Sequence, residues 1–213
     1  MMDNTDIKLG IGIPLSWPYA SSDFFDSFAM MNKENAEIFR AQSGPVDGMR
    51  NQIVIRALEK ECTHLIFLDA DMVYPRDTLT KLLNHDKDIV GALTFKRAPN
   101  FEPLLFIGKP YKMTLLDPIP EGLVKITATG TGCLMVKTLV YENLDYPWFS
   151  FGENDGKPVG EDIGFCYNAG AKGYSIYVDT TIQTEHLCSV RVNWNLYQLQ
   201  KDMLAQGLSG FKI

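Results

Sequence analysis

The sequence predicts an α/β fold in which a mixed, mainly parallel sheet is flanked by helices. In the first half of the chain, apolar segments of strand length alternate with segments whose apolar residues recur at helical spacing. This alternation is typical of a layered fold whose strands are joined by helices. The segment His64–Leu68 is almost continuously apolar, as expected of a central strand that is buried on both faces.

The first half of the chain is expected to form four strands and three helices. Pro14 is expected to end the first strand, and Ser21 or Ser22 is expected to cap the first helix. The expected strands are Ile7–Ile13, Ala36–Ala41, His64–Leu68 and Asp88–Phe95, and the expected helices are Asp23–Met31, Asp47–Glu61 and one that begins near Pro75.

The second half is expected to be less regular. Residues 96–129 contain many prolines and should be irregular, with short strands around Leu104 and Val124. Phe149–Gly160 has several glycines and polar residues and should form a mobile loop. Further strands are expected at Cys133–Val136 and Tyr174–Val178, and helices at Lys137–Asn143 and Glu161–Lys172. We expect residues 1–186 to form one domain and residues 187–213 to be a C-terminal extension that packs on it.

Length and composition also indicate a single globular domain. The chain has 213 residues, of which 46% are hydrophobic and 22% are charged. A chain of this length buries most of its apolar surface without disulfides or structural metals. The formal net charge of −6 argues against broad attraction to nucleic acid or to anionic membranes. Nucleic acid is therefore the less favoured class of partner.

The sequence contains no pattern for export or membrane insertion. No apolar run approaches the length of a transmembrane helix, and the start MMDNTDIKLG lacks the regions of a signal peptide. The four cysteines are far apart and form no C-x-x-C pair, which excludes zinc ribbons and thioredoxin-like motifs. We therefore expect a cytoplasmic protein with reduced thiols and no membrane span.

The most informative residues are Asp69 and Asp71, which follow the apolar strand in LIFLDADMVYP. Two carboxylates separated by one residue in extended chain point to the same side. They lie at the carboxyl end of a strand, where open α/β sheets bind ligands. Their repulsion is relieved if a hard cation such as Mn²⁺ or Mg²⁺ binds between them. Two aspartates that merely cap the following turn would give the same local pattern.

A second acidic pair, Glu161 and Asp162, follows Gly160 at the start of a predicted helix. An acidic side chain at a helix N-terminus stabilises the helix by about 0.3–1 kcal/mol through the helix dipole. This structural role explains the presence of one acid well and of two acids less well. A carboxylate beside a flexible loop can also act as a general base that takes a proton from an attacking hydroxyl.

His186, in TIQTEHL, follows the last predicted strand. A lone histidine is more often a packed or surface residue than a metal ligand. At a strand end, however, this imidazole could complete a metal site that begins with Asp71.

Two further segments could contact a ligand. Gly130, Thr131 and Gly132 precede an apolar strand and let the backbone approach a ligand closely, although an ordinary turn would look the same. Arg50 and Asn51 lie in the first turn of a predicted helix, where a guanidinium and backbone amides favour phosphates or base edges. A surface ion pair is the alternative there.

Taken in order, these motifs resemble those of GT-A fold glycosyltransferases, close to family 2 and its small soluble phage and bacterial members. A DxD motif alone is weak evidence for this family. The succession of DxD, GTG, WF, GED and a final His is a more specific signature. The segments that carry the resemblance are SGPVDGMRNQIV, THLIFLDADMVYPRDTL, DIVGALTF, ATGTGCLMVK, PWF, GEDIGFCYNAGAKGYSIYVD and TEHL, within Ile7 to Leu187.

The resemblance implies a metal-dependent transfer of a sugar from a nucleotide-sugar, with a UDP-sugar favoured. Asp71 and His186 would bind Mn²⁺ or Mg²⁺, which grips the diphosphate of the donor. Asp69 would face the ribose of the donor or the water shell of the metal. In inverting members the last acid of the ED motif is the base, which implies Asp162, with Glu161 contacting the acceptor or the donor sugar.

The resemblance also implies roles for flanking residues. Arg50 and Asn51 match a segment that lines the nucleotide pocket, and Trp148 with Phe149 match an aromatic wall near the acceptor. The loop Phe149–Gly160 would be a lid that excludes water. The sequence lacks the DDGS-like segment that reads uracil, which leaves the donor base open, and it lacks QxxRW, which argues against a processive polysaccharide synthase.

Two other interpretations of the function remain open. Residues 69–73 also fit the DxDx[TV] motif of haloacid-dehalogenase-like phosphatases, in which Asp69 would attack phosphorus and Asp71 would act as acid and base. That motif normally follows the first strand, whereas here it follows the third. The second alternative is a module that binds a nucleotide-sugar without turnover.

Overall fold

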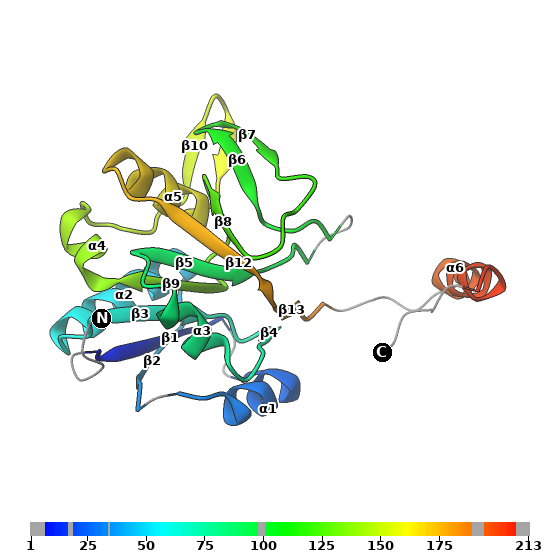
Figure 1. Ribbon diagram of the computed structural model, residues 1–213, viewed down its shortest axis with the longest axis horizontal. Helices are drawn as coiled ribbons and strands as arrows, with labels where there is room; N and C mark the ends of the chain where they lie inside the picture. Colours follow the sequence, from blue (N-terminus) through cyan, green and yellow to red (C-terminus); the bar gives the residue numbers. More distant parts are fainter. Residues whose placement is uncertain (1–6, 17–18, 34, 98–100, 189–193, 208–213) are drawn as a thin grey trace.

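The computed structural model describes residues 7–16, 19–33, 35–97, 101–188 and 194–207. A seven-stranded sheet forms its centre (Figure 1). In spatial order its strands are β2 (Glu37–Gln42), β1 (Leu9–Leu15), β3 (His64–Leu68), β9 (Cys133–Lys137), β5 (Ile89–Leu93), β12 (Ile176–Gln183) and β8 (Leu123–Ile126).

The sheet is mixed and mainly parallel, as the sequence predicts. Strands β2, β1, β3, β5 and β12 run in one direction, whereas β9 and β8 run in the opposite direction. Because β9 lies between β3 and β5, its beginning meets the ends of these two neighbours. The segment before β9 therefore lies at the same edge of the sheet as the residues that follow β3 and β5.

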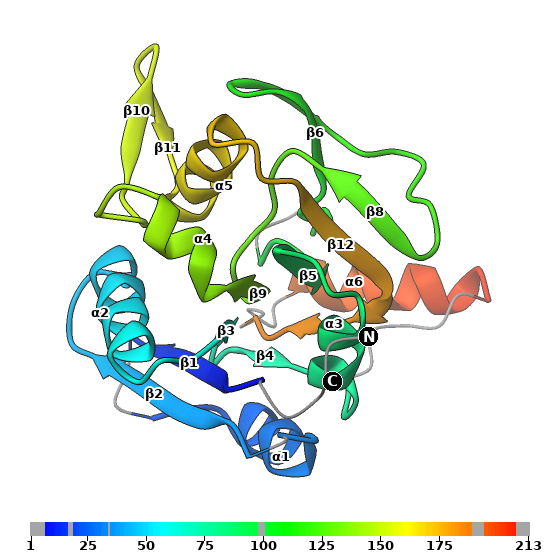
Figure 2. The same cartoon turned by 60° about the vertical axis from the view of Figure 1, so that its left-hand side comes forward.

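Helices cover both faces of the sheet (Figure 2). The alternation of side chains along β3 explains the two layers, because Leu65 and Phe67 enter one apolar core while Ile66 and Leu68 enter the other. The first core also contains residues of α2 (Val46–Glu59), α4 (Thr138–Asn143) and α5 (Glu161–Ala171), and the second contains residues of α1 (Ser22–Met30) and α3 (Thr78–Asn84).

The elements of the first half follow the sequence prediction, with shifts at some ends. The expectation that Pro14 ends the first strand is wrong, since β1 pairs with β2 as far as Leu15. Its pairing with β3 stops at Gly12, so β1 has a free side where Pro14 lacks an N–H. Ser21 caps α1 by accepting from the N–H of Phe24 at 3.1 Å.

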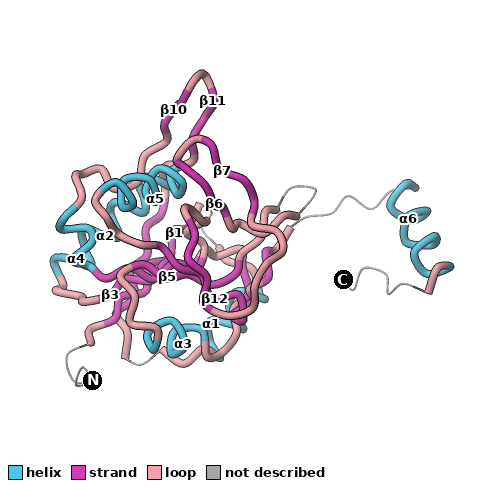
Figure 3. Tube along the Cα trace, turned by 45° about the horizontal axis from the view of Figure 1, so that its top comes forward, coloured by secondary structure: helices cyan, strands magenta, loops and turns pink. Residues whose placement is uncertain are grey.

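Two hairpins occupy segments that were expected to be irregular. One is formed by β6 (Phe106–Lys109) and β7 (Lys112–Leu115), within the proline-containing middle. The other is formed by β10 (Gly152–Asn154) and β11 (Lys157–Val159), and it projects from the rest of the chain (Figure 3). Asp155 and Gly156 join its strands with positive φ angles of 50° and 73°, which is the Asp-Gly turn favoured in tight hairpins.

The chain after β12 contributes to a second, two-stranded sheet. The short strand β13 (Glu185–His186) pairs antiparallel with β4 (Met72–Val73). Figure 1 shows α6 (Trp194–Ala205) away from the sheet, so the packing of residues 187–213 on the domain stays a prediction. Residues 189–193 and 208–213 of that extension lie outside the described residues.

Among the residues that the structure describes, no helix has the length and apolar character needed to cross a membrane. All four thiols are free, and those of Cys62, Cys133 and Cys166 are buried, while Cys188 is exposed.

Candidate active site

A pocket of about 570 Å³ opens at the edge where the parallel strands β1, β3 and β5 end. Its volume falls within the range of about 300–1,000 Å³ that is usual for small-molecule sites. Most of the residues predicted to form the site line it, namely Arg50, Asp69, Asp71, Gly130, Thr131, Gly132, Glu161, Asp162 and His186. Residues separated by more than a hundred positions in the sequence therefore share one cavity.

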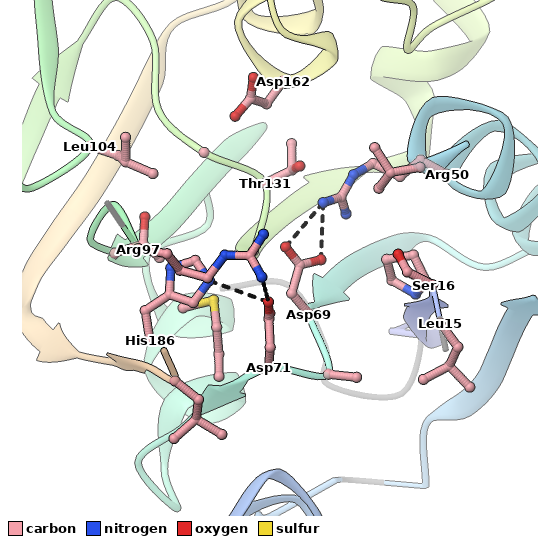
Figure 4. A pocket seen from close by; sticks show the side chains of 18 of the residues that line it. Leu15, Ser16, Arg50, Asp69, Asp71, Arg97, Leu104, Thr131, Asp162 and His186 are labelled. Atoms are coloured by element: carbon pink, nitrogen blue, oxygen red, sulfur yellow. Dashed lines mark hydrogen bonds and ion pairs between the residues drawn. The ribbon is translucent and has the colours of Figure 1, made fainter. Parts of the chain in front are cut away.

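Arg50 fixes one wall of this pocket (Figure 4). Its Nη2 lies 2.9 and 3.1 Å from the two carboxylate oxygens of Asp69, and its Nε lies 3.4 Å from Oε1 of Glu161. The guanidinium is almost fully buried, 5.1 Å from the centre of the Phe67 ring. Burial alone would lower the pKa of Arg50, but the charges of Asp69 and Glu161 outweigh it and raise the pKa. Arg50 therefore stays charged and joins α2, β3 and α5.

The two aspartates of the DxD motif both line the pocket, but they are reached through a turn rather than the expected extended chain, and each has its own basic partner. The chain turns after Asp69, whose carbonyl accepts from the N–H of Met72 at 3.3 Å. Asp69 pairs with Arg50, whereas Asp71 pairs with Arg97 at 2.7 Å. Each carboxylate is thus neutralised by a different guanidinium, and the two do not depend on one shared cation.

Asp71 and His186 meet in the pocket, as the sequence predicts. Pairing of β13 with β4 brings them together, and the N–H of Leu187 donates to the carbonyl of Asp71 at 2.8 Å. His186 Nε2 lies 3.5 Å from Asp71 Oδ2. Burial alone would raise the pKa of Asp71 and lower that of His186, but their mutual attraction reverses both shifts, so the pKa of Asp71 is lowered and that of His186 is raised.

The same two residues fit a divalent metal ion. His186 Nδ1 donates to the carbonyl of Phe95 at 2.6 Å, which leaves Nε2 as the nitrogen that can bind a metal. A carboxylate and an imidazole are suitable ligands for Mn²⁺. No cluster of three or more histidine, cysteine or acidic side chains that could hold a metal occurs among the described residues.

Asp162 is the titratable group best suited to accept a proton. It lies in the first turn of α5, where its Oδ1 accepts from the N–H of Ile163 at 2.7 Å. Burial, reinforced by the neighbouring charge of Glu161, raises the pKa of Asp162 to about 6. A carboxylate with a pKa near 6 is ionised at neutral pH, yet it is basic enough to assist proton transfer.

The glycines of the GTG segment leave room for this side-chain arrangement. A Cβ at Gly130 would lie 2.8 Å from Leu104 and 3.7 Å from both Asp162 Oδ2 and Thr94 Oγ1. The hydroxyls of Thr94 and Thr131 are buried without a hydrogen-bond partner among the described residues, and both threonines line the pocket. These hydroxyls are candidates to bond a polar ligand.

We expect Gly132→Ala to destabilise the fold by about 1–3 kcal/mol, as overpacking of a dense site usually does. The added Cβ would lie 2.6 Å from Met72 Sδ and 3.1 Å from Asp69 Oδ2, so both side chains would have to shift. Denaturant unfolding measures the effect. Gly170→Ala is the control, because that helical position has no neighbouring atom within 4 Å, and unchanged stability of Gly132→Ala would contradict the packing argument.

Two of the predicted site residues lie elsewhere. The side chain of Asn51 makes two hydrogen bonds with the backbone of Phe149. Its Nδ2 donates to the Phe149 carbonyl at 2.7 Å, and its Oδ1 accepts from the Phe149 N–H at 3.1 Å. Trp148 donates its indole N–H to the carbonyl of Tyr141 at 2.8 Å and is buried in the core with Phe149. Asn51, Trp148 and Phe149 therefore do not line this pocket, and their expected roles toward the nucleotide and the acceptor stay predictions. These side chains join α2 and α4 to the segment before β10.

Sequence reasoning missed Tyr74, Thr94 and Arg97. Tyr74 is buried, and its hydroxyl lies 2.8 Å from the carbonyl oxygens of both Asp69 and Gly132, so it joins the DxD turn to the GTG segment. Thr94 and Arg97 follow the end of β5. Their position after a central strand was the available signal, because the DxD motif was found by the same criterion.

No family model and no curated protein matches the sequence. Solved structures do match, at low sequence identity. A197 from STIV matches with a TM-score of 0.63 and 17% identity, over 86% of this chain and 87% of that one. S. aureus TarS 1–349, solved in complex with UDP-GlcNAc, matches with a TM-score of 0.54 and 12% identity, over 97% of this chain and 68% of that one.

GalNAc-T7, solved with UDP, GalNAc and Mn²⁺, matches with a TM-score of 0.52 and 11% identity. The match covers 87% of this chain but only 44% of that one, so this chain spans less than half the length of GalNAc-T7. TarS and GalNAc-T7 are glycosyltransferases. The α/β architecture with its seven-stranded mixed sheet is therefore the GT-A fold.

Proposed function

We propose that this protein is a metal-dependent glycosyltransferase that moves a sugar from a nucleoside-diphosphate-sugar to an acceptor hydroxyl with inversion. The observation that carries the proposal is the meeting of two different groups in one pocket. Asp71 and His186 offer metal ligands, and Asp162 offers a base whose pKa is raised to about 6. The GT-A fold supports this assignment, and the UDP-GlcNAc of the TarS structure and the UDP of the GalNAc-T7 structure favour a UDP-sugar.

In this proposal, Asp71 and His186 hold Mn²⁺ or Mg²⁺. When bound, the ion offsets the charge that develops on the leaving diphosphate. Asp69 is a poorer metal ligand, because Arg50 contacts both of its carboxylate oxygens. We therefore assign Asp69 to the ribose or the metal-bound water, and we assign Glu161 to holding Arg50 in place.

Asp162 accepts the proton of the acceptor hydroxyl while the acceptor oxygen bonds to the anomeric carbon of the sugar. The bond between that carbon and the diphosphate oxygen breaks, and its electron pair leaves with the nucleoside diphosphate. One oxygen of Asp162 is already bonded to the N–H of Ile163, which leaves the other to receive the proton. The unpaired hydroxyls of Thr94 and Thr131 are placed to bond hydroxyl groups of the sugar.

The phosphatase alternative is disfavoured by the surroundings of Asp69. A nucleophilic aspartate needs a free oxygen to attack phosphorus, whereas both oxygens of Asp69 contact the buried Arg50. A binding module without turnover would use the same pocket but would not need a base. The raised pKa of Asp162 favours catalysis over simple binding.

A thermal-shift panel tests the proposal with UDP-, GDP-, CMP- and dTDP-sugars, each with and without Mn²⁺. At a hundredfold excess over Kd, a ligand stabilises its protein by about 2.7 kcal/mol, which raises Tm by about 5–10 °C for a chain of this size. We expect this shift only with Mn²⁺ and one diphosphate donor. The CMP-sugar, with its single phosphate, is the matched control. A panel in which no donor shifts Tm in the presence of Mn²⁺ would contradict the proposal.

A further inference from the structure

Arg97 places a positive charge at the proposed metal site, where the function proposed above gives it no role (Figure 4). Its Nη1 lies 2.7 Å from Asp71 Oδ2, the same oxygen that lies 3.5 Å from His186 Nε2. The side chain of Arg97 is 60% exposed and that of Asp71 is 39% exposed. The ion pair is therefore open to solvent, and Arg97 can leave it at low cost.

The segment that carries Arg97 is attached to the site through its backbone. The carbonyl of Phe95 accepts from His186 at 2.6 Å, and Phe95 forms a β-bridge with Pro103. The N–H of Lys96 donates to the carbonyl of Glu102 at 2.9 Å. These contacts fix the chain just before Arg97 relative to His186, which keeps the guanidinium within reach of Asp71 and of the pocket.

A bound donor would change the balance of charge around Arg97. A metal ion held by Asp71 would compete with the guanidinium of Arg97, which lies 2.7 Å from Asp71 Oδ2. The donor at the same time brings a diphosphate with several negative oxygens. The planar guanidinium can donate two parallel hydrogen bonds to phosphate oxygens. Arg97 would thus lose one anionic partner and gain a stronger one in the same pocket.

We propose that Arg97 is a second cationic ligand of the donor diphosphate, and that Asp71 holds it beside the site in the ligand-free protein. This inference rests on the proposed glycosyltransferase function. Arg97 leaves Asp71 when the metal and the donor bind, and it then donates to diphosphate oxygens. Arg97 therefore opposes binding of the metal alone but favours binding of the metal together with the diphosphate.

The test measures two affinities of Arg97→Ala and of the wild type. Electron paramagnetic resonance of free Mn²⁺ gives the affinity for Mn²⁺ alone, and titration calorimetry with saturating Mn²⁺ gives the affinity for UDP. Loss of an exposed ion pair should tighten Mn²⁺ binding by about threefold. Loss of a charge-assisted hydrogen bond should weaken UDP binding by about tenfold or more. Arg97→Lys should weaken UDP binding by less.

Lys81→Ala is the matched control. Lys81 forms an exposed ion pair with Asp77 at 2.9 Å, with 43% and 49% exposure, and neither residue lines the pocket. We expect this variant to leave both affinities within twofold of the wild type. Its result separates the specific effect of Arg97 from the general loss of one positive charge.

The possible outcomes distinguish the two proposals. If the wild type binds UDP with Mn²⁺ and Arg97→Ala binds it equally well, the role of Arg97 is overturned while the proposed function stands. If Arg97→Ala weakens both affinities, Arg97 supports the metal site rather than competing with the metal, which also overturns the inference. If the wild type binds none of UDP, GDP and dTDP with Mn²⁺, the proposed function fails and the inference fails with it.

Discussion

Asp162→Asn is expected to lower turnover by about 10²–10⁴-fold, which is the usual contribution of a general base. The substitution keeps the size of the side chain and leaves Oδ1 able to accept from the N–H of Ile163, so the start of α5 should be unchanged. Binding of UDP with Mn²⁺ should stay within twofold of the wild type. The measurement is release of nucleoside diphosphate from the donor that the thermal-shift panel identifies, with a panel of hydroxyl acceptors.

Glu161→Gln provides the comparison for this variant. Glu161 contacts the buried Arg50, so its loss should lower stability more than it lowers turnover per folded molecule. If Asp162→Asn retained turnover while Glu161→Gln lost it, the roles assigned to the two acids would have to be exchanged. If neither variant reduced turnover, the base would have to lie outside this pair.

The pH dependence of activity follows from the same carboxyl. Asp162 must be ionised to accept a proton, and its pKa is raised to about 6. We therefore expect kcat/KM to rise with pH through about 6 and to level above it. The ascending limb should disappear in Asp162→Asn, whose residual rate has no carboxyl to titrate. A limb that persists in this variant would belong to another group.

The raised pKa also predicts an effect on stability. The folded protein binds the Asp162 proton more tightly than the unfolded chain does, so ionised Asp162 costs stability once the pH rises through about 6. Asp162→Asn removes this cost and should be more stable than the wild type by about 1–3 kcal/mol at pH 8. The difference should shrink toward pH 4. Denaturant unfolding at both pH values measures it.

The sequence was sufficient to predict the sheet and the convergence of Asp71 with His186. Apolar segments mark β3 and β5, and the ends of parallel strands gather at one edge. Residues that directly follow such strands therefore meet, whatever their distance along the chain. The direction of β9 could not be predicted in this way, because an apolar strand looks the same whichever way it runs between β3 and β5.

The sequence was not sufficient to separate ligand-facing polar residues from those that support the fold. Arg50 and Asn51 are neighbours on α2, yet Arg50 lines the pocket and Asn51 bonds the backbone of Phe149. A polar residue next to a predicted site gives no sign of which buried carbonyl or N–H it satisfies. That choice depends on how α2 packs against a segment about a hundred residues later.

Asp71→Asn is expected to remove Mn²⁺-dependent donor binding. The carboxylate of Asp71 is the anionic member of the proposed metal site, and Asn offers only a neutral oxygen. Its loss should cost more than the roughly 10–100-fold in metal affinity that follows from losing a residue that only supports a ligand. Electron paramagnetic resonance of free Mn²⁺ measures the affinity, and release of nucleoside diphosphate measures the accompanying loss of turnover.

Asp69→Asn is the matched comparison, because it makes the same chemical change two residues away in the same turn. Asp69 pairs with Arg50, so its loss should leave Mn²⁺ binding closer to the wild type and reduce turnover less than Asp71→Asn. A phosphatase would show the reverse order, since its first aspartate is the nucleophile. Complete loss of activity in Asp69→Asn with intact Mn²⁺ binding in Asp71→Asn would therefore replace the transferase assignment with the phosphatase one.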